Sequence, residues 1–166
     1  MNDARKAPFV ASSERPGTGL EYLQRIVSGE YAPLPIGEHL GFRIAAAEPG
    51  KVTIKGRPDE RSYNLLKGVH GGWTAAVLDT AMALSNLTLL GVEQTFTTLD
   101  IRINYLRPIT VETGEVTAIG GVLQSGRKIA YVEAKLLDAN GKLLAHGTGS
   151  LLIMAREPQS SKGNPT

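Results

Sequence analysis

The segment from Gly68 to Val92 constrains the fold more than any other part of the sequence, because Asp79 is its only formally charged residue. Apolar residues recur at helical spacing, which predicts a helix from about residue 71 to residue 90. The opposite side of this helix is hardly more polar, so other parts of the protein must enclose it. The main apolar stripe contains Trp73, Ala76, Val77, Ala81, Leu84 and Leu87.

Such a helix could be mistaken for a membrane span. Its Thr, Ser and Asn content, its aspartate and the strand patterns on both sides instead indicate a buried helix of a soluble protein. We therefore expect no interaction with a membrane. The net charge is only +2 and the lysines and arginines are scattered, so nucleic acid is not an expected partner either.

Extended segments on both sides of the helix predict the sheet that encloses it. Two strands joined by a Pro49-Gly50 turn precede the helix, and four longer strands follow it. The first of the four alternates between polar residues and the apolar set Leu99, Ile101, Ile103 and Tyr105. We expect that apolar face to be buried. The predicted strands lie at about 40–48, 52–56, 95–106, 114–123, 128–137 and 143–154.

Together these elements predict one α+β domain, in which a curved antiparallel sheet of about six strands wraps around one long central helix. We place this domain at residues 19–154, with a short helix at 20–28. Pro33 and Pro35 are expected to break the chain before the first strand, and residues 58–69 form a loop. The segments 1–18 and 155–166 have too few apolar residues to order themselves, so both ends are expected to be mobile.

The residue types present limit the possible chemistry. The chain has no cysteine, which excludes a disulfide scaffold, a thiolate nucleophile and a cysteine metal site. Its three histidines, His39, His70 and His146, are too dispersed for a ligand cluster, so we expect no metal and no cofactor. Residues 1–15 lack the apolar core of a signal peptide, which makes the cytoplasm the expected location.

Asp79 is the first candidate for chemistry, because an ionised carboxylate is costly to bury unless it is paired or hydrogen-bonded. In a structural interpretation, it binds backbone groups or pairs with a residue such as Arg102. In a functional interpretation, desolvation tunes it as a general base or a nucleophile. Both interpretations need the same burial, so the residue alone does not decide between them.

The sequence His70-Gly71-Gly72 stands at the start of the predicted helix, where the first N–H groups lack partners and the helix dipole is positive. Glycine lets a ligand carbonyl approach the main chain closely, which suits an oxyanion site at the Gly71 N–H. Two other interpretations stay open. The glycines can simply shape the turn into the helix, and His70 can order the loop by binding backbone instead of acting as a base.

The spacing between Gly71 and Asp79 indicates an oligomer. Eight residues of helix separate the two by about 12 Å along the axis. That is too far for the carboxylate to act on a carbonyl group bound at the Gly71 N–H of the same chain. Two copies of the helix running antiparallel would bring Gly71 of one subunit near Asp79 of the other. We therefore expect an obligate homodimer with two shared sites, and a tetramer where two dimers associate.

Three stretches of the chain resemble the PaaI-type acyl-CoA thioesterases of the hotdog superfamily. The first is Gly68-Val69-His70-Gly71-Gly72 with the following 75–81, the second is 97–108, and the third is Ala145-His146-Gly147-Thr148. The resemblance covers about residues 38–154. It implies the hotdog fold and hydrolysis of an acyl-CoA substrate, either a phenylacetyl-CoA-like aryl-acyl-CoA or a medium-chain acyl-CoA, with CoA as part of the substrate.

The resemblance also implies roles for individual residues. Asp79 matches the helix aspartate that acts as nucleophile or general base on the thioester, and Gly71 matches the glycine whose N–H binds the oxyanion. Asn64, six residues before His70, matches an asparagine that polarises the carbonyl or positions water. Thr98 matches a residue that helps to hold the water. Asparagine in a turn and threonine in a strand are also common for structural reasons alone.

Acyl-CoA brings several phosphate charges, so cationic side chains are expected near the site entrance. The candidates are Arg107, at a strand end, and Arg127-Lys128, in a turn, although most such residues are only solvated charges. Gly72 and Trp73 are further candidates for contact with the substrate. Trp73 and Met82 can equally be core residues, which is the commoner use of such side chains.

Two other functions stay open. One is a hotdog dehydratase or hydratase, which would use a histidine with an acidic partner; the His-Gly-Gly sequence resembles the thioesterases more. The other is a non-catalytic acyl-CoA-binding module, such as a ligand sensor. A sensor would be expected to carry an effector segment, and the short terminal segments offer none.

Overall fold

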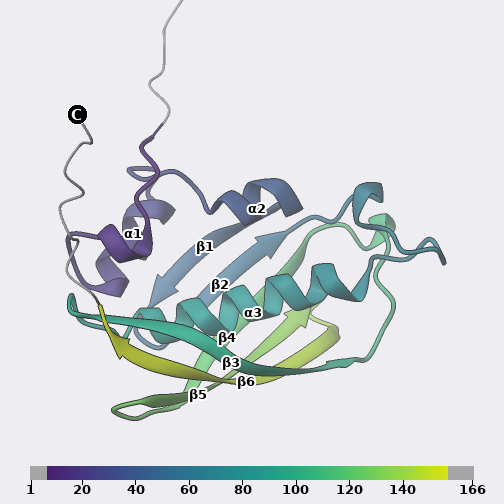
Figure 1. Ribbon diagram of the computed structural model, residues 1–166. Helices are drawn as coiled ribbons and strands as arrows, with labels where there is room; N and C mark the ends of the chain where they lie inside the picture. Colours follow the sequence, from purple (N-terminus) through teal and green to yellow (C-terminus); the bar gives the residue numbers. More distant parts are fainter. Residues whose placement is uncertain (1–6, 157–166) are drawn as a thin grey trace, which may run out of the picture.

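The computed structural model describes residues 7–156, so the predicted mobile ends at 1–6 and 157–166 lie outside the described residues. Within this range the helices are α1 (Gly19–Val27), α2 (Pro35–Leu40) and α3 (Gly71–Leu87). The strands are β1 (Phe42–Glu48), β2 (Lys51–Gly56), β3 (Gln94–Tyr105), β4 (Val116–Ser125), β5 (Ile129–Leu137) and β6 (Leu143–Ala155). This is the predicted α+β arrangement, in which one long helix lies inside a curved sheet (Figure 1).

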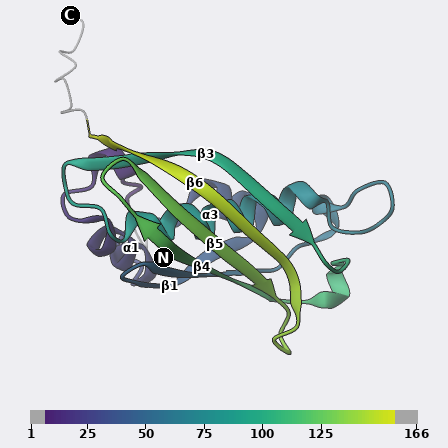
Figure 2. The same cartoon turned by 90° about the horizontal axis from the view of Figure 1, so that it is seen from below.

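The six strands form one antiparallel sheet in the order β1-β2-β4-β5-β6-β3. Although β3 directly follows α3 in the chain, it joins the far edge of the sheet beside β6, and the sheet curls around the helix (Figure 2). With 12 residues, β3 is a long strand. Its outer edge has no partner strand within residues 7–156.

Small residues on the concave face let α3 lie close to the sheet. Ala81 lies directly over Gly120 of β4, where any side chain would overlap the Ala81 carbonyl group. On the other flank, the Met82 methyl group lies 3.4 Å from where a Cβ on Gly147 of β6 would be. Both helix residues are fully buried. These contacts fix the rotation of α3 and turn Asp79 towards β3, where it contacts Thr98.

Helix α2 is absent from the sequence prediction, which treats Pro33 and Pro35 as breaks. Pro35 occupies the first turn of the helix, where a missing N–H costs nothing. Gly41 ends the helix in the left-handed conformation at φ 74°. Trp73 then donates from its indole N–H to the Leu40 carbonyl oxygen at 2.8 Å. The proline that was expected to break the chain therefore starts a short helix, and the last residue of that helix accepts the hydrogen bond from Trp73.

The prediction of a buried apolar face on β3 is wrong for most of that face in the single chain. Leu99, Ile101 and Tyr105 are all exposed, and Ile103 is half-buried. A bulge between Thr98 and Asp100 interrupts the alternation, and β3 is an edge strand whose outer edge has no partner strand within the described residues. The residues have the pattern of a buried face, but this chain does not bury them.

Residues 7–18, which the sequence pattern assigns to a mobile segment, pack against the domain. Arg15 is fully buried, and its guanidinium group donates to the carbonyl oxygens of Gly91 and Gln94 at 2.8 and 2.6 Å. Arg156 donates in turn to the Arg15 carbonyl oxygen. Between residues 7 and 156, no helix combines the length and apolar character needed to cross a membrane.

Candidate active site

Asp79 lies in the middle of α3 and is half-buried against β3. The Thr98 hydroxyl group donates to its Oδ1 at 3.1 Å. Burial raises the pKa of the carboxyl group, and the Thr98 hydrogen bond opposes part of that rise. Arg102 is exposed, and no ion pair joins it to Asp79 within the described chain. Within one chain the structural interpretation through Arg102 therefore finds no support, and Thr98 is the side chain that contacts the carboxylate.

His70 caps the N-terminus of α3. Its Nδ1 accepts a hydrogen bond from the Gly72 N–H at 2.8 Å, so this nitrogen carries no proton in the cap. The His70 backbone N–H donates to the Ser62 carbonyl oxygen at 2.7 Å. These contacts match the interpretation in which the histidine orders the loop and the helix start.

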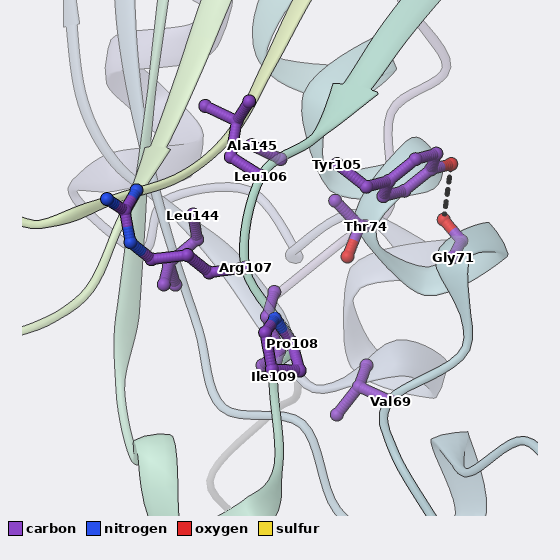
Figure 3. A pocket seen from close by; sticks show the side chains of 10 residues that line it. All are labelled: Val69, Gly71, Thr74, Tyr105, Leu106, Arg107, Pro108, Ile109, Leu144 and Ala145. Atoms are coloured by element: carbon purple, nitrogen blue, oxygen red, sulfur yellow. Dashed lines mark hydrogen bonds between the residues drawn. The ribbon is translucent and has the colours of Figure 1, made fainter. Parts of the chain in front are cut away.

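Gly71 is the first residue of α3, and its two backbone groups differ. Its carbonyl oxygen accepts from the Tyr105 hydroxyl group at 3.0 Å, whereas its N–H has no hydrogen-bond partner within residues 7–156. A cavity of about 350 Å³ opens beside it (Figure 3). Its lining comprises Val69, Gly71, Thr74, Tyr105, Leu106, Arg107, Pro108, Ile109, Leu144 and Ala145. Gly71, which carries the free N–H, therefore lines a ligand-sized space.

Asn64 shapes the loop before α3. Its Oδ1 accepts from the Leu66 N–H at 2.8 Å and the Gly68 N–H at 3.2 Å, and its backbone N–H donates to the Gly68 carbonyl oxygen. Such a side chain–backbone turn is the common structural use of asparagine. Both contacts occupy the carbonyl oxygen of the side chain, so the amide NH₂ group is the part that can face a substrate.

The candidate CoA-binding cations lie at opposite ends of the sheet. Arg107 lines the cavity at Gly71, and its backbone N–H donates to Leu144 at the start of β6. Lys128 follows Arg127 in the exposed β4–β5 turn, and its carbonyl oxygen accepts from Ile153 near the end of β6. Nine strand residues, or about 30 Å, separate Leu144 from Ile153. Within one chain, Arg107 lies beside Gly71, whereas Arg127 and Lys128 lie at the end of the sheet nearer Asp79.

Trp73 and Met82 are core residues, whereas Tyr105 lies beside Gly71. Trp73 is buried in the core, although it also lines a second cavity together with His70 and Gly72. Met82 is fully buried between α3 and the sheet. Tyr105, which sequence reasoning assigned only to a buried strand face, is brought against Gly71. No local motif marks that contact, since 34 residues separate the two.

Within one chain, Gly71 and Asp79 do not form a common site. The helix holds them about 12 Å apart along its axis, and Asp79 does not line the cavity beside Gly71. The structure thus contains two half-sites, an open N–H with its cavity and a desolvated carboxylate with its threonine.

A curved six-stranded sheet around one long helix, with polar groups at the start and centre of that helix, places the chain in the hotdog class of folds. Comparisons with known proteins identify the family. The family model described as the thioesterase superfamily matches residues 66–145. Human acyl-coenzyme A thioesterase 13 is 32% identical over 108 residues, which cover 63% of this chain and 74% of the relative. The chain belongs to the thioesterase superfamily, as the resemblance in its sequence implies.

Solved structures agree with this family. A phenylacetic acid degradation-related protein from Ralstonia eutropha is similar with a TM-score of 0.70 and 27% identity, over 79% of this chain and 98% of that chain. A thioesterase from Haemophilus influenzae has a TM-score of 0.70 and 26% identity over 84% and 92%. A mutant of the phenylacetic acid degradation protein PaaI from Thermus thermophilus has a TM-score of 0.65 and 28% identity over 72% and 98%.

Proposed function

We propose that this acyl-CoA thioester hydrolase acts on a phenylacetyl-CoA-like aryl-acyl-CoA or a medium-chain acyl-CoA, releasing the free acid and CoA. Relatives named as an acyl-CoA thioesterase and as phenylacetic acid degradation proteins support both the reaction and the substrate class. The observation that carries the proposal is the carboxylate of Asp79, which is half-buried and, within residues 7–156, is hydrogen-bonded only to Thr98. Neither a metal nor a cofactor has a role in the proposed reaction.

The proposed chemistry uses the two half-sites together. The Gly71 N–H binds the thioester carbonyl oxygen and stabilises the negative charge that develops there. As a general base, Asp79 takes a proton from water, the hydroxide adds to the carbonyl carbon, and the C–S bond then breaks to release CoA as thiolate. As a nucleophile, Asp79 attacks the same carbon itself and forms an anhydride that water hydrolyses. In both cases Thr98 holds Oδ1, which leaves Oδ2 to act.

The proposal requires a second copy of the chain. One chain separates its half-sites. Within residues 7–156 it also leaves the long edge of β3 without a partner strand and the apolar side chains of Leu99 and Ile101 exposed. A twofold axis that sets two α3 helices antiparallel would place Gly71 of each chain near Asp79 of the other. Such a dimer would also bring Arg107 of one chain and Lys128 of the other to the same shared site.

Mixing two inactive variants tests the shared site. Asp79→Asn homodimers and Gly71→Ala homodimers each have two damaged sites, whereas a mixed dimer has one intact site and one doubly damaged site. Unfolding and refolding an equal mixture is expected to restore on the order of a quarter of wild-type activity, because about half of the dimers are mixed in a symmetric pair. A mixture that refolds into dimers yet stays as inactive as its components contradicts the shared site.

A substrate panel tests the proposed substrate class. Thiol release is measured with phenylacetyl-CoA, octanoyl-CoA, acetyl-CoA and palmitoyl-CoA. The highest kcat/KM is expected for one of the first two, because the cavity of about 350 Å³ beside Gly71 is too small for a long acyl chain. Release limited to acetyl-CoA or palmitoyl-CoA contradicts the substrate class. Binding of all four without release of thiol would favour a non-catalytic acyl-CoA-binding module.

The dehydratase or hydratase alternative receives no support from His70. Its Nδ1 is occupied by the Gly72 N–H, and no acidic partner contacts it within the described residues. A histidine that must exchange protons with a hydroxyacyl substrate would need a free ring nitrogen with an acid to orient it.

A further inference from the structure

Tyr105, at the end of β3, connects the sheet to the first turn of α3. Its hydroxyl group donates to the Gly71 carbonyl oxygen at 3.0 Å. The residue is 56% exposed and lines the cavity at the helix start (Figure 3). A tyrosine that served only to pack the fold would be expected to bury more of its ring.

The lack of a side chain at residue 71 is explained by Tyr105 and not by backbone conformation. Gly71 is not among the glycines with positive φ, so its backbone angles suit any L-residue. A Cβ on Gly71 would lie 3.2 to 3.3 Å from three atoms of the Tyr105 side chain, tighter than ordinary van der Waals contact. The tyrosine ring therefore occupies the space beside Gly71 that a side chain would need.

Tyr105 and His70 hold the two ends of one peptide group. The Gly71 carbonyl accepts from Tyr105, and the N–H of the same peptide group, which belongs to Gly72, donates to His70 Nδ1. Glycine is the residue with the greatest backbone freedom, and two glycines in sequence leave this turn intrinsically loose. Fixing this peptide group at both ends helps to set the direction of the neighbouring Gly71 N–H, whose own peptide group is held by the Trp73 N–H at the His70 carbonyl oxygen.

We propose that Tyr105 is a positioning residue of the thioester site and one wall of its substrate pocket. Its hydroxyl group fixes the peptide group that orients the Gly71 N–H, and its exposed ring lies along the apolar part of the bound thioester. The inference rests on the proposed function, because it acts through Gly71. It gives Tyr105 two separable roles, one in kcat through the hydroxyl group and one in substrate binding through the ring.

The test compares Tyr105→Phe and Tyr105→Leu with the same changes at Tyr131. Tyr131, on β5, is 53% exposed and makes no side-chain hydrogen bond within residues 7–156, so it is a matched control. With phenylacetyl-CoA, Tyr105→Phe is expected to lower kcat about fivefold, the rate equivalent of one hydrogen bond, with KM unchanged. Tyr105→Leu is expected to raise KM as well. The Tyr131 variants should match wild type in both constants, and all variants should be fully folded at the assay temperature.

Several results would overturn the inference. A Tyr105→Phe enzyme with wild-type kcat, or with kcat reduced only in step with its melting temperature, removes the positioning role. A Tyr105→Leu enzyme with wild-type KM contradicts the role of the Tyr105 ring as a wall of the substrate pocket. Calorimetry with a ketone analogue, in which a methylene group separates the carbonyl from the sulfur, tests the wall without turnover. Wild-type protein that binds this analogue but releases no thiol from phenylacetyl-CoA contradicts the proposed function. Unchanged binding of the analogue by Tyr105→Leu contradicts the role of Tyr105.

Discussion

Replacing Asp79 with asparagine is expected to lower kcat for thioester hydrolysis by about a thousandfold while the protein still folds. Asparagine keeps the shape of the side chain, and its amide oxygen can still accept from Thr98, so the packing between α3 and β3 should survive. The variant loses the proton acceptor and the nucleophile together. Thiol release from phenylacetyl-CoA measures the effect, and circular dichroism confirms the fold.

The control for Asp79 is Asp100, another acidic residue of the same region. It lies two residues beyond Thr98 on β3, is exposed, and accepts a hydrogen bond from Ser150. Asp100→Asn should change kcat by less than about twofold. Asp79→Asn with full activity would contradict the assignment of Asp79, and equal losses in both variants would indicate that the effect comes from the lost charge in general.

The raised pKa of Asp79 also predicts how pH affects stability. Below the unfolded-state value of 3.8 the carboxyl group is neutral in both states. As pH rises, the unfolded chain releases this proton first, so Asp79 stabilises the folded state less as pH passes through its folded pKa. The asparagine of the Asp79→Asn variant does not titrate. Denaturant unfolding should therefore show the variant gaining stability relative to wild type as pH rises from below 3.8 through the raised folded-state pKa of Asp79.

The sequence predicted the helix and the strands well because their signals are local. The long helix was expected at 71–90 and lies at Gly71–Leu87, and each predicted strand overlaps an observed one. Helix α2 was missed because Pro35 was interpreted as a break in the chain before the first strand, whereas it starts a helix. That error is also local. Gly41, a glycine that can end a helix, follows Pro35 by six residues and is the signal that could have corrected it.

The strand order could not be predicted, because it depends on contacts between distant residues. β3 pairs with β6, so Thr98 faces Leu151 across more than 50 positions of chain, and no turn sequence fixes that register. The contact between Thr98 and Asp79 follows from this pairing. The resemblance to a family named both residues, but only the folded chain shows that one donates to the other.

The exposed face of β3 shows a limit of prediction from sequence patterns. Alternation correctly identifies Ile101 and Tyr105 as one face, yet it does not say which chain covers that face. In the described chain both residues are exposed. The pattern that suggests a buried core is thus also the pattern of a surface that a second subunit or a substrate can bury.

Replacing Gly71 with alanine is expected to lower kcat/KM about a hundredfold with little change in stability. Alanine favours the helix over glycine, and the exposed Tyr105 ring can move to relieve the contact of 3.2 to 3.3 Å. The N–H is retained, but the added methyl group displaces the Tyr105 ring and hinders the thioester carbonyl from reaching it, and losing one such donor costs roughly 10²–10³-fold in an acyl-transfer enzyme. Gly121→Ala on β4, where a Cβ meets nothing within 4 Å, is the control.

Two routes could produce that loss, and a double variant separates them. The methyl group could push Tyr105 away and so release the peptide group, or it could itself block the thioester carbonyl. If the loss acts through the ring, Gly71→Ala should cost much less in a Tyr105→Leu background, because no ring remains to be displaced. If the methyl group blocks the substrate, the two losses multiply. Wild-type kcat/KM in Gly71→Ala would contradict both routes, because it would show that the methyl group neither disturbs the peptide group nor blocks the substrate.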